Sequence, residues 1–458
     1  MSFRNKRRSS APGRFFLIVL LSLVLISAAA SYFLFFEGEK PVASLNKTKN
    51  YIGQNSNIEY TISDRKSGIR SITIYAIQGE LKKLLHTVTF PRATYIGQAG
   101  PLEQEQAIPF DAKKLGFKDG QLTLSLEAVD FSLRGWLKGN KTLVNKEITV
   151  DTKPPRIEIL HSEKYIIPGG AGIAIYRLSD SDTEHGVMLN DHFNPGFLVG
   201  DGRDDTFISF FGLPYDAKKI NSLQVRAIDK AGNIATFPFS TIYKNDRKKK
   251  DKINVSDGFL NRKIPEFQQH YQDMTGNLLE KYLYINNTVR QQNNKTISEL
   301  CSNSLDERFW KGRFMRMSGS SRAGFADYRT YYFNGKEVDY QTHLGMDIAS
   351  TRRADVRAAN NGVVIFADYL GIYGNMVIVD HGQGVFSLYS HLSQINSAVG
   401  ESVDQQTVLG LTGTTGMAGG DHLHFSILVN GIFVTPKEWW DQHWIDVTIE
   451  EPITDSKF

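Results

Sequence analysis

The stretch His422-Leu-His-Phe-Ser-Ile-Leu-Val-Asn-Gly-Ile-Phe-Val-Thr435 decides the fold of the C-terminal part of this 458-residue chain. Asn430-Gly431 is the strongest short signal for a hairpin turn, so the residues on either side of it are predicted to pair as strands. Successive side chains of a strand point to opposite faces. One face then carries Leu423, Phe425 and Ile427, and the other carries His422, His424 and Ser426. Two imidazoles are therefore expected to project from a rigid sheet into one polar space.

More strands are predicted upstream in the same glycine-rich region. Residues 363–367, 375–380 and 385–391 have the composition of strands, and Asp380-His-Gly-Gln-Gly384 joins the last two as a turn. An antiparallel β domain is therefore predicted over residues 305–445, followed by a tail over residues 446–458.

His343-Leu-Gly-Met-Asp347 supplies two more candidate ligands. Histidine and aspartate both bind zinc, and Gly345 is expected to let the backbone bend so that His343 and Asp347 converge. A histidine and an aspartate at this spacing are a weak signal alone. Together with His422 and His424 in one β domain they indicate a metal site.

The region from about residue 340 to 437, with typical sequence back to about Arg313, resembles the lysostaphin-type or LytM-like peptidoglycan endopeptidases of the M23 metallopeptidase family. The matching residues are His343-Leu-Gly-Met-Asp347, Gly362-Val-Val, Tyr373-Gly-Asn375, Val379-Asp-His-Gly382, Leu388-Tyr-Ser-His391-Leu, Gly410, Gly413, Gly416 and His422-Leu-His424-Phe.

This resemblance implies a zinc endopeptidase that cuts peptide cross-links between the stem peptides of bacterial peptidoglycan. Residue by residue, His343, Asp347 and His424 match the family's Zn²⁺ ligands, and His391 and His422 match its two catalytic histidines. His422 is expected to act as general base and then as acid, while His391 donates to the oxyanion or shares the proton transfer. The alternative is a non-catalytic LytM-like regulator of cell-wall hydrolases. All five residues being present favours the enzyme.

Three further features of this region receive structural interpretations. His381 is expected to be a turn residue and not a ligand, and His443 a packing or surface residue. The glycine-rich residues 410–420 lack the lysine of a P-loop and lead into a strand, which favours a substrate-cleft loop.

The N-terminus predicts export. Residues 15–36 carry no charge and are long enough to cross a membrane as a helix, with a basic tail before them in residues 1–14. The positive-inside rule places that tail in the cytoplasm and the rest outside. We therefore expect a single-pass protein of the inner (cytoplasmic) membrane, with the catalytic domain in the periplasm or otherwise outside the membrane. Ala28-Ala29-Ala30 resembles a processing site, so a cleaved signal peptide is the alternative.

Residues 41–243 consist of short strands and turns with an internal repeat. Phe110-Asp-Ala-Lys-Lys114 and the following strand recur at Tyr215-Asp-Ala-Lys-Lys219, an offset typical of tandem sandwiches. Two immunoglobulin-like domains are predicted, over residues 41–153 and 154–243, divided near Pro154-Pro155. They are expected to be spacers, with binding of cell-envelope partners as the alternative.

A basic linker and a short helical connector are predicted over residues 244–304, with one or two amphipathic helices between residues 265 and 300. The fold class is thus mainly β, with an N-terminal transmembrane helix, two sandwiches, a helical connector and the peptidase-like domain. A net charge of +4 that comes largely from two short clusters excludes a continuous phosphate-binding surface, so nucleic acid is not an expected partner. Cys301 is the only cysteine, so no intramolecular disulfide forms and the metal ligands must be His, Asp or Glu.

Overall fold

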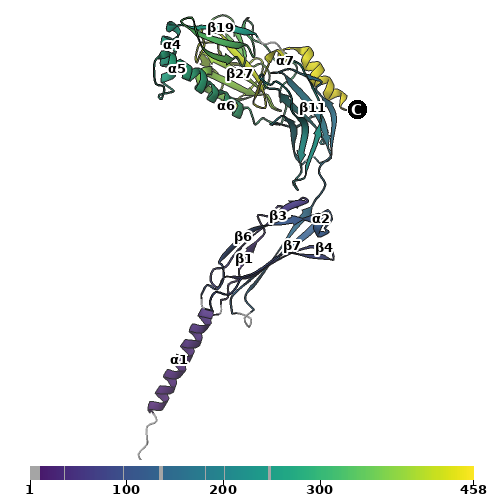
Figure 1. The fold of residues 1–458 in the computed structure, drawn as a ribbon, viewed down its shortest axis with the longest axis vertical. Coiled ribbons are helices and arrows are strands. Elements are labelled where there is room, and N and C mark those ends of the chain that lie inside the picture. The colour runs from purple at the N-terminus through teal and green to yellow at the C-terminus, as the bar shows by residue number, and fades with distance from the viewer. Residues whose placement is uncertain are drawn as a thin grey trace, which may run out of the picture. The chain divides into compact units, whose positions relative to one another are not determined.

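The structure, a computed structural model, describes residues 11–457 apart from residues 36, 96, 134–137, 181, 201 and 246–248. Packing divides the chain into two compact units: Met1–Pro154 with Asp229–Asn233, and Pro155–Ile228 with Ile234–Phe458. Strands dominate both units, which confirms the mainly β fold (Figure 1).

An apolar helix, α1 (Ala11–Phe35), opens the described part of the chain. Its segment Gly13–Tyr32 is long and apolar enough to cross a membrane, and none of it is buried. The predicted apolar run is helical up to residue 35. Residue 36 and the basic residues before residue 11 lie outside the described residues. Membrane anchors and signal peptides both contain such a helix, so both alternatives stand.

The first unit contains a sandwich of two sheets, with strand orders β1-β3-β6 and β2-β8-β7-β4-β5. A short helix, α2 (Ala112–Leu115), joins β6 to β7. The strands are β1 (Val42–Ser44), β2 (Tyr51–Ile52), β3 (Asn55–Ser63), β4 (Ile69–Gln78), β5 (Leu81–Thr89), β6 (Glu103–Asp111), β7 (Gly120–Asp130) and β8 (Lys141–Val150).

The second sandwich opens the second unit and repeats this strand order. Strands β15-β11-β9 correspond to β6-β3-β1, with β14 added at the edge, and sheet β13-β12-β16-β17 corresponds to β5-β4-β7-β8. Strand β10 pairs parallel with β18 as β2 does with β8. The immunoglobulin-like character of both sandwiches stays a prediction. The strands are β9 (Ile157–Ser162), β10 (Tyr165–Ile166), β11 (Ala171–Leu178), β12 (Glu184–Leu189), β13 (His192–Pro195), β14 (Phe197–Leu198), β15 (Thr206–Gly212), β16 (Leu223–Ile228), β17 (Ile234–Pro238) and β18 (Ile242–Tyr243).

The connector contains more regular structure than predicted. Residues 250–255, partly assigned to the solvated linker, form β19 (Lys250–Val255), which pairs parallel with β21 (Tyr328–Phe333). The first helix begins at Asp257, ahead of the predicted window, because the Ser256 side chain accepts from the Phe259 N–H and caps it. The helices are α4 (Asp257–Gln268), α5 (Leu278–Tyr284), η1 (Ile285–Val289) and α6 (Arg290–Leu300).

An antiparallel sheet forms the core of the C-terminal domain, with strand order β20-β23-β31-β27-β26-β25-β29 and β32 paired to β31. The predicted strands and the Asn430-Gly431 hairpin are all present. The remaining strands make two small sheets, β19-β21-β22 and β24-β30-β28. The bounds are β20 (Ser320–Ala323), β22 (Lys336–Thr342), β23 (Met346–Ala349), β24 (Asp355–Arg357), β25 (Gly362–Leu370), η2 (Gly371–Tyr373), β26 (Gly374–Asp380), β27 (Val385–Leu392), β28 (Gln394–Ile395), β29 (Ser402–Val403), β30 (Val408–Leu411), β31 (Leu423–Val429) and β32 (Ile432–Val434).

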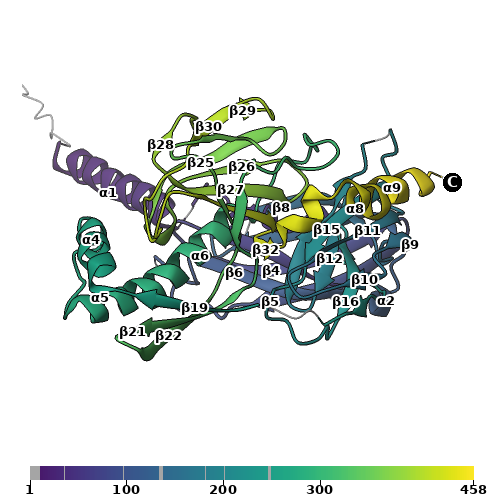
Figure 2. The ribbon, with the colours of Figure 1, turned by 90° about the horizontal axis from the view of Figure 1, so that it is seen from above.

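Both faces of this sheet are buried, each against a different neighbour. Alternate residues such as Ile378, Leu388 and Leu428 pack with α4–α6, whereas Val379, Tyr389 and Ile427 pack in a core that includes Ile175 and Phe210 of the second sandwich. In Figure 2, α4–α6 lie to the left of β27, and β11 and α9 lie to its right. The second sandwich and the C-terminal domain therefore share a hydrophobic core.

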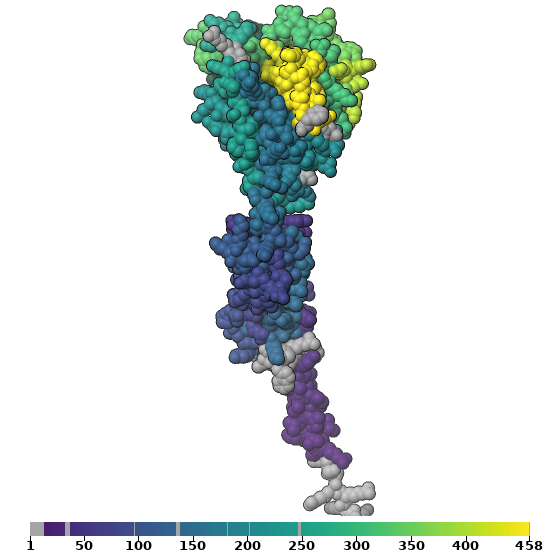
Figure 3. Space-filling view, turned by 90° about the vertical axis from the view of Figure 1, so that its right-hand side faces the viewer, coloured from purple at the N-terminus to yellow at the C-terminus, as the bar shows by residue number. Residues whose placement is uncertain are grey.

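The C-terminal residues belong to this shared core. They form α7 (Pro436–Trp440), α8 (Gln442–Ile445), η3 (Asp446–Glu450) and α9 (Glu451–Asp455). Figure 3 shows this yellow segment on the surface of the unit beside the second sandwich, and Arg203 Nη1 donates to the Ser456 carbonyl oxygen at 2.6 Å. The segment predicted as a tail from residue 446 is thus ordered, with Ile449 fully buried.

Candidate functional site

The three predicted ligands converge on one point. Asp347 on β23 pairs in register with His424 on β31, and His343 lies in the turn that enters β23. His343 Nε2 lies 2.9 Å from His424 Nδ1, and Asp347 Oδ1 lies 3.0 Å from each of these atoms. Ligand atoms about 2.0–2.1 Å from a tetrahedral zinc are separated by ~3.3 Å, so this triangle is close to the size that a zinc ion requires.

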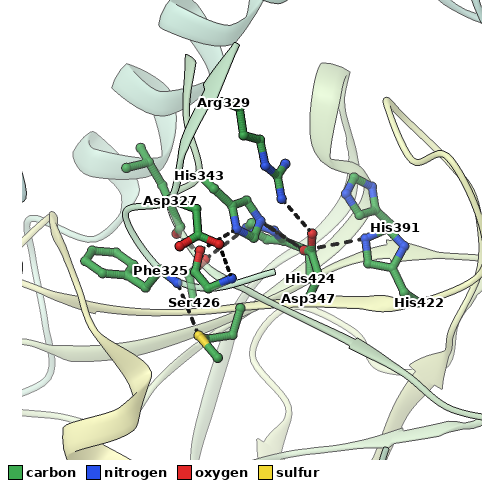
Figure 4. A network of polar contacts seen from close by, with 12 residues as sticks. Phe325, Asp327, Arg329, His343, Asp347, His391, His422, His424 and Ser426 are labelled. Atoms are coloured by element: carbon green, nitrogen blue, oxygen red, sulfur yellow. Dashed lines mark hydrogen bonds and ion pairs between the residues drawn. The ribbon is translucent and has the colours of Figure 1, made fainter. Parts of the chain in front are cut away.

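Hydrogen bonds on the outer nitrogens fix the tautomers of the two imidazoles (Figure 4). His343 Nδ1 donates to the Gly324 carbonyl oxygen at 2.8 Å. Ser426 Oγ donates to the Leu344 carbonyl oxygen, so it accepts from His424 Nε2 at 3.1 Å. Both inner nitrogens therefore direct lone pairs at the carboxylate of Asp347. The donor set fits a cation, because three lone-pair atoms cannot satisfy one another.

Gly345 serves the site through its lack of a side chain. A Cβ at this position would lie 2.5 Å from His424 Nε2 and 2.6 Å from Ser426 Oγ. The backbone bends at Gly345, as expected, although its φ is not positive. Close approach of the chain to the His424 ring requires the glycine.

His391 and His422 lie beside this triangle, with their ring centroids 4.9 Å apart. His391 Nδ1 donates to the Thr415 carbonyl oxygen at 2.9 Å, and His422 Nδ1 donates to that of Gly420 at 2.7 Å. The Nε2 atom of each is left for the cleft, and that of His422 lies 3.5 Å from Asp347 Oδ1. His391 also has a φ of +65°, a strained conformation for a non-glycine residue of the kind that clusters at active sites.

Burial and neighbouring charges shift the pKa values of His391 and His422 in opposite directions. Burial lowers the pKa of His391 well below its ordinary value, and the neighbouring His422 and His424 lower it further. Burial also lowers the pKa of His422, but Asp347 more than offsets this and raises it.

Arg329 is a site residue that the sequence did not reveal. Arg329 lies on β21, and its Nη2 donates to Asp347 Oδ2 at a distance of 3.0 Å. Its side chain is only 18% exposed. Asp347 is thereby held by the arginine on one oxygen, which directs the other oxygen at the imidazoles. Arg329 and Asp347 lie on strands of two different sheets, β21 and β23, so no sequence motif connects them.

The site opens into a cavity of about 300 Å³. The connector supplies one wall, through Val255, Phe259, Tyr282 and Arg290. Met417, Ala418 and Gly419 also line the cavity, so the glycine-rich segment lies at the cleft, as predicted. His343, Asp347, His391, His422 and His424 all face this cavity.

The two other histidines of the region lie outside the site. His381 is fully buried, with its nitrogens bonded to the Asn361 carbonyl oxygen and Ser387 Oγ. His443 is exposed in α8.

Residues 341–436 match the family model described as peptidase family M23. The chain carries an M23 peptidase domain. Over 97 residues it is 40% identical to the DD-carboxypeptidase/endopeptidase Mpg of Neisseria meningitidis, covering 21% of this chain and 22% of that protein. Over 95 residues it is 37% identical to the murein hydrolase activator EnvC of Escherichia coli, covering 21% of this chain and 23% of that protein.

These similarities concern the M23 domain alone, since the chain matches less than a quarter of the length of either relative. A crystal structure of an M23 peptidase from Pseudomonas aeruginosa aligns with 59% of this chain and 92% of its own, at 19% identity and a TM-score of 0.37.

Proposed function

We propose that this protein is a zinc metalloendopeptidase, anchored in the cytoplasmic membrane, that hydrolyses peptide cross-links of peptidoglycan. The observation that carries the proposal is the buried triangle of lone pairs from His343, Asp347 and His424, with two histidines beside it. Membership of the M23 family supports it, as does the endopeptidase activity in the name of the Neisseria relative.

Zinc fits the donor set better than harder cations do. Two imidazole nitrogens and one carboxylate oxygen are common zinc ligands, whereas calcium and magnesium prefer oxygen alone. Three protein ligands leave a coordination position for the substrate or water, as in catalytic zinc sites. When bound, the ion would polarise the scissile carbonyl and increase the acidity of water.

The proton transfers would fall to the two remaining histidines. His422 presents Nε2 beside the triangle, 3.5 Å from Asp347 Oδ1, so it is placed to accept a proton from the attacking water and return it to the leaving amine. His391 is held neutral by burial, and its Nδ1 is bound to the loop carbonyl of Thr415. It would orient the water or share the proton with His422, whose ring centroid lies 4.9 Å away.

The connector would position the substrate. Apolar walls of the cleft come from Phe259 and Tyr282 of the connector and from Tyr331 and Tyr373 outside it. Positive charge in the cleft comes from Arg290 of the connector and from Arg329. An extended peptide that carries carboxylates fits such a surface. The apolar helix α1 would be the membrane anchor.

The activator in the name of the E. coli relative supplies a second candidate, a non-catalytic regulator of cell-wall hydrolases. A regulator has no need of a metal site or of catalytic histidines. The two functions therefore differ in metal content and in direct cleavage.

The test is metal analysis and peptidoglycan digestion by the full chain purified in detergent. We expect one zinc per chain and the release of cleaved cross-linked peptides, identified by mass spectrometry, with loss of both in His424→Ala. His443→Ala, which changes an exposed histidine of the same domain, should behave as wild type. A chain that binds no zinc and cleaves nothing, but accelerates a cell-wall amidase, would establish the regulator instead.

A further inference from the structure

A second group of buried acids lies in the first unit. The carboxylates of Glu37, Asp64 and Asp130 each place an oxygen within 4.8 Å of the others. These residues are only 8%, 5% and 0% exposed. Among the described residues, no lysine or arginine forms an ion pair with any of the three. Charges of one sign are thus gathered in a buried place without a pairing cation from the described part of the chain, which is costly unless a ligand supplies one.

Two of the three carboxylates are held in fixed orientations. Asp64 Oδ1 accepts the backbone N–H groups of Lys66 at 3.1 Å and Gly68 at 2.7 Å. Asp130 accepts the backbone N–H of Asn140 on one oxygen at 2.6 Å and its side-chain amide on the other at 2.8 Å.

Glu37 is the acid with an unused oxygen. Its Oε2 accepts the Ser67 N–H at 3.0 Å, whereas its Oε1 is buried and has no hydrogen-bond partner. Burial raises the pKa of Glu37, and Asp64 and Asp130 raise it further. A buried carboxylate oxygen without a partner, in a cluster of acids, is the arrangement that a bound cation resolves.

The repeat in the second sandwich provides an internal comparison. There the Asn233 amide donates to Asp229 Oδ2 and to the Asp151 carbonyl oxygen, both at 2.9 Å, as the Asn140 amide donates to Asp130 and to the Glu37 and Glu39 carbonyl oxygens. The aspartate–asparagine corner is therefore a feature of the fold and needs no cation. No comparable set of three acids is found around Asp229 in the described residues. The convergence of three acids is an addition specific to the first sandwich.

We infer that Glu37, Asp64 and Asp130 form a binding site for a hard divalent cation, with calcium the ion that fits best. The donors are all oxygens, whereas zinc and copper prefer sites that contain nitrogen or sulfur ligands. Calcium accepts several protein carboxylates at once, whereas magnesium retains most of its water and seldom occupies a site built from protein groups alone. This site shares no residue with the M23 cleft and does not depend on the proposed function.

The location gives the ion a structural role. Glu37 is the second residue after α1, while Asp64 begins the turn before β4 and Asp130 ends β7. Calcium would tie the segment that follows the apolar helix to two loops of the first sandwich. The junction would then be rigid at extracellular calcium levels and looser without calcium.

The experiment is equilibrium dialysis of the full chain in detergent against radioactive calcium, with scanning calorimetry of the same samples. We expect wild type to bind one calcium with a dissociation constant at or below the ~10⁻⁴–10⁻³ M of extracellular modules. Glu37→Gln and Asp130→Asn should each bind at least tenfold more weakly. Glu80→Gln, which removes one exposed negative charge from the turn after β4, is the matched control and should bind as wild type does.

Calorimetry keeps the inference testable if a variant folds poorly. In calcium-free buffer, Glu37→Gln should unfold at the same temperature as wild type or higher, because it loses a repulsion. With calcium added, wild type should gain stability and Glu37→Gln should not, so that wild type becomes the more stable of the two. Absence of saturable binding by folded wild type up to about 10 mM, tenfold above the weak end of that range, would overturn the inference. Undiminished binding by Glu37→Gln and Asp130→Asn, or an equal loss in Glu80→Gln, would also overturn it.

Discussion

His185 in the second sandwich provides a test of the shared core. Its ring is buried against Phe207, with centroids 4.1 Å apart, and the Tyr176 hydroxyl lies 2.8 Å from His185 Nδ1. Burial raises the pKa of Tyr176, so the hydroxyl remains protonated and donates to an unprotonated Nδ1. Burial lowers the pKa of His185 to about 4. The folded protein therefore requires this imidazole to be neutral.

The size and sign of the effect follow from this difference in pKa. An unfolded histidine titrates near pH ~6.5, so between that value and about pH 4 the unfolded state binds more protons than the folded state. Stability is then full above the unfolded pKa and decreases as the pH falls through this interval. A difference of about 2.5 units at 1.36 kcal/mol each corresponds to about 3 kcal/mol at most.

The test is His185→Gln, which keeps an acceptor for Tyr176 and removes the titration. At neutral pH the variant should be less stable, because it loses the ring contact with Phe207. Its free energy of unfolding should then fall by about 3 kcal/mol less than that of wild type on acidification to about pH 4.

Urea unfolding followed by tryptophan emission is the assay. Four of the five tryptophans, Trp310, Trp439, Trp440 and Trp444, pack in or against the core that the sandwich shares with the M23 domain. Parallel pH profiles for wild type and variant would refute the buried neutral histidine. If the two proteins differed in pH dependence by circular dichroism but not by tryptophan emission, the second sandwich and the C-terminal domain would not unfold as one unit. His443→Gln, at an exposed position, is the control.

Three further predictions concern the cleft and the anchor. His422→Ala should keep its zinc and lose turnover by at least ~10²-fold, as expected for a general acid–base group, whereas His424→Ala should lose zinc and turnover together; reversed zinc contents would exchange the two roles. Lys263→Met should lower turnover while zinc is retained, because the buried Lys263 ammonium donates to the Thr414 carbonyl oxygen, next to the carbonyl that holds His391; unchanged kinetics would show that the loop does not need this contact. The chain should fractionate with membranes at full length, and a reporter fused after residue 40 should be exported; a soluble form that begins near Ser31 would establish a cleaved signal peptide.

The sequence predicted the strands and the convergence of the candidate site residues because both depend on short-range patterns. Alternation placed His422 and His424 on one face of a strand, and Asn430-Gly431 fixed the hairpin that supports it. Arg329 and the connector wall were not predictable in this way. They reach the cleft through the parallel pairing of β19 with β21 and through helix packing, which no local period encodes.

The connector is best understood as part of the cleft that holds the candidate site. Its helices hydrogen-bond to the cleft at separate points. Lys263 of α4 binds the Thr414 carbonyl, Asn293 of α6 accepts the Ile372 N–H at 2.9 Å, and Asn294 accepts the Tyr373 hydroxyl at 2.8 Å. The segment matched to the M23 family begins only at residue 341, after all of these helices. A boundary drawn from family similarity would therefore remove one wall of the cavity and the supports of the glycine-rich loop. Sequence similarity delimits the chemistry of this protein, whereas packing delimits the unit that can perform it.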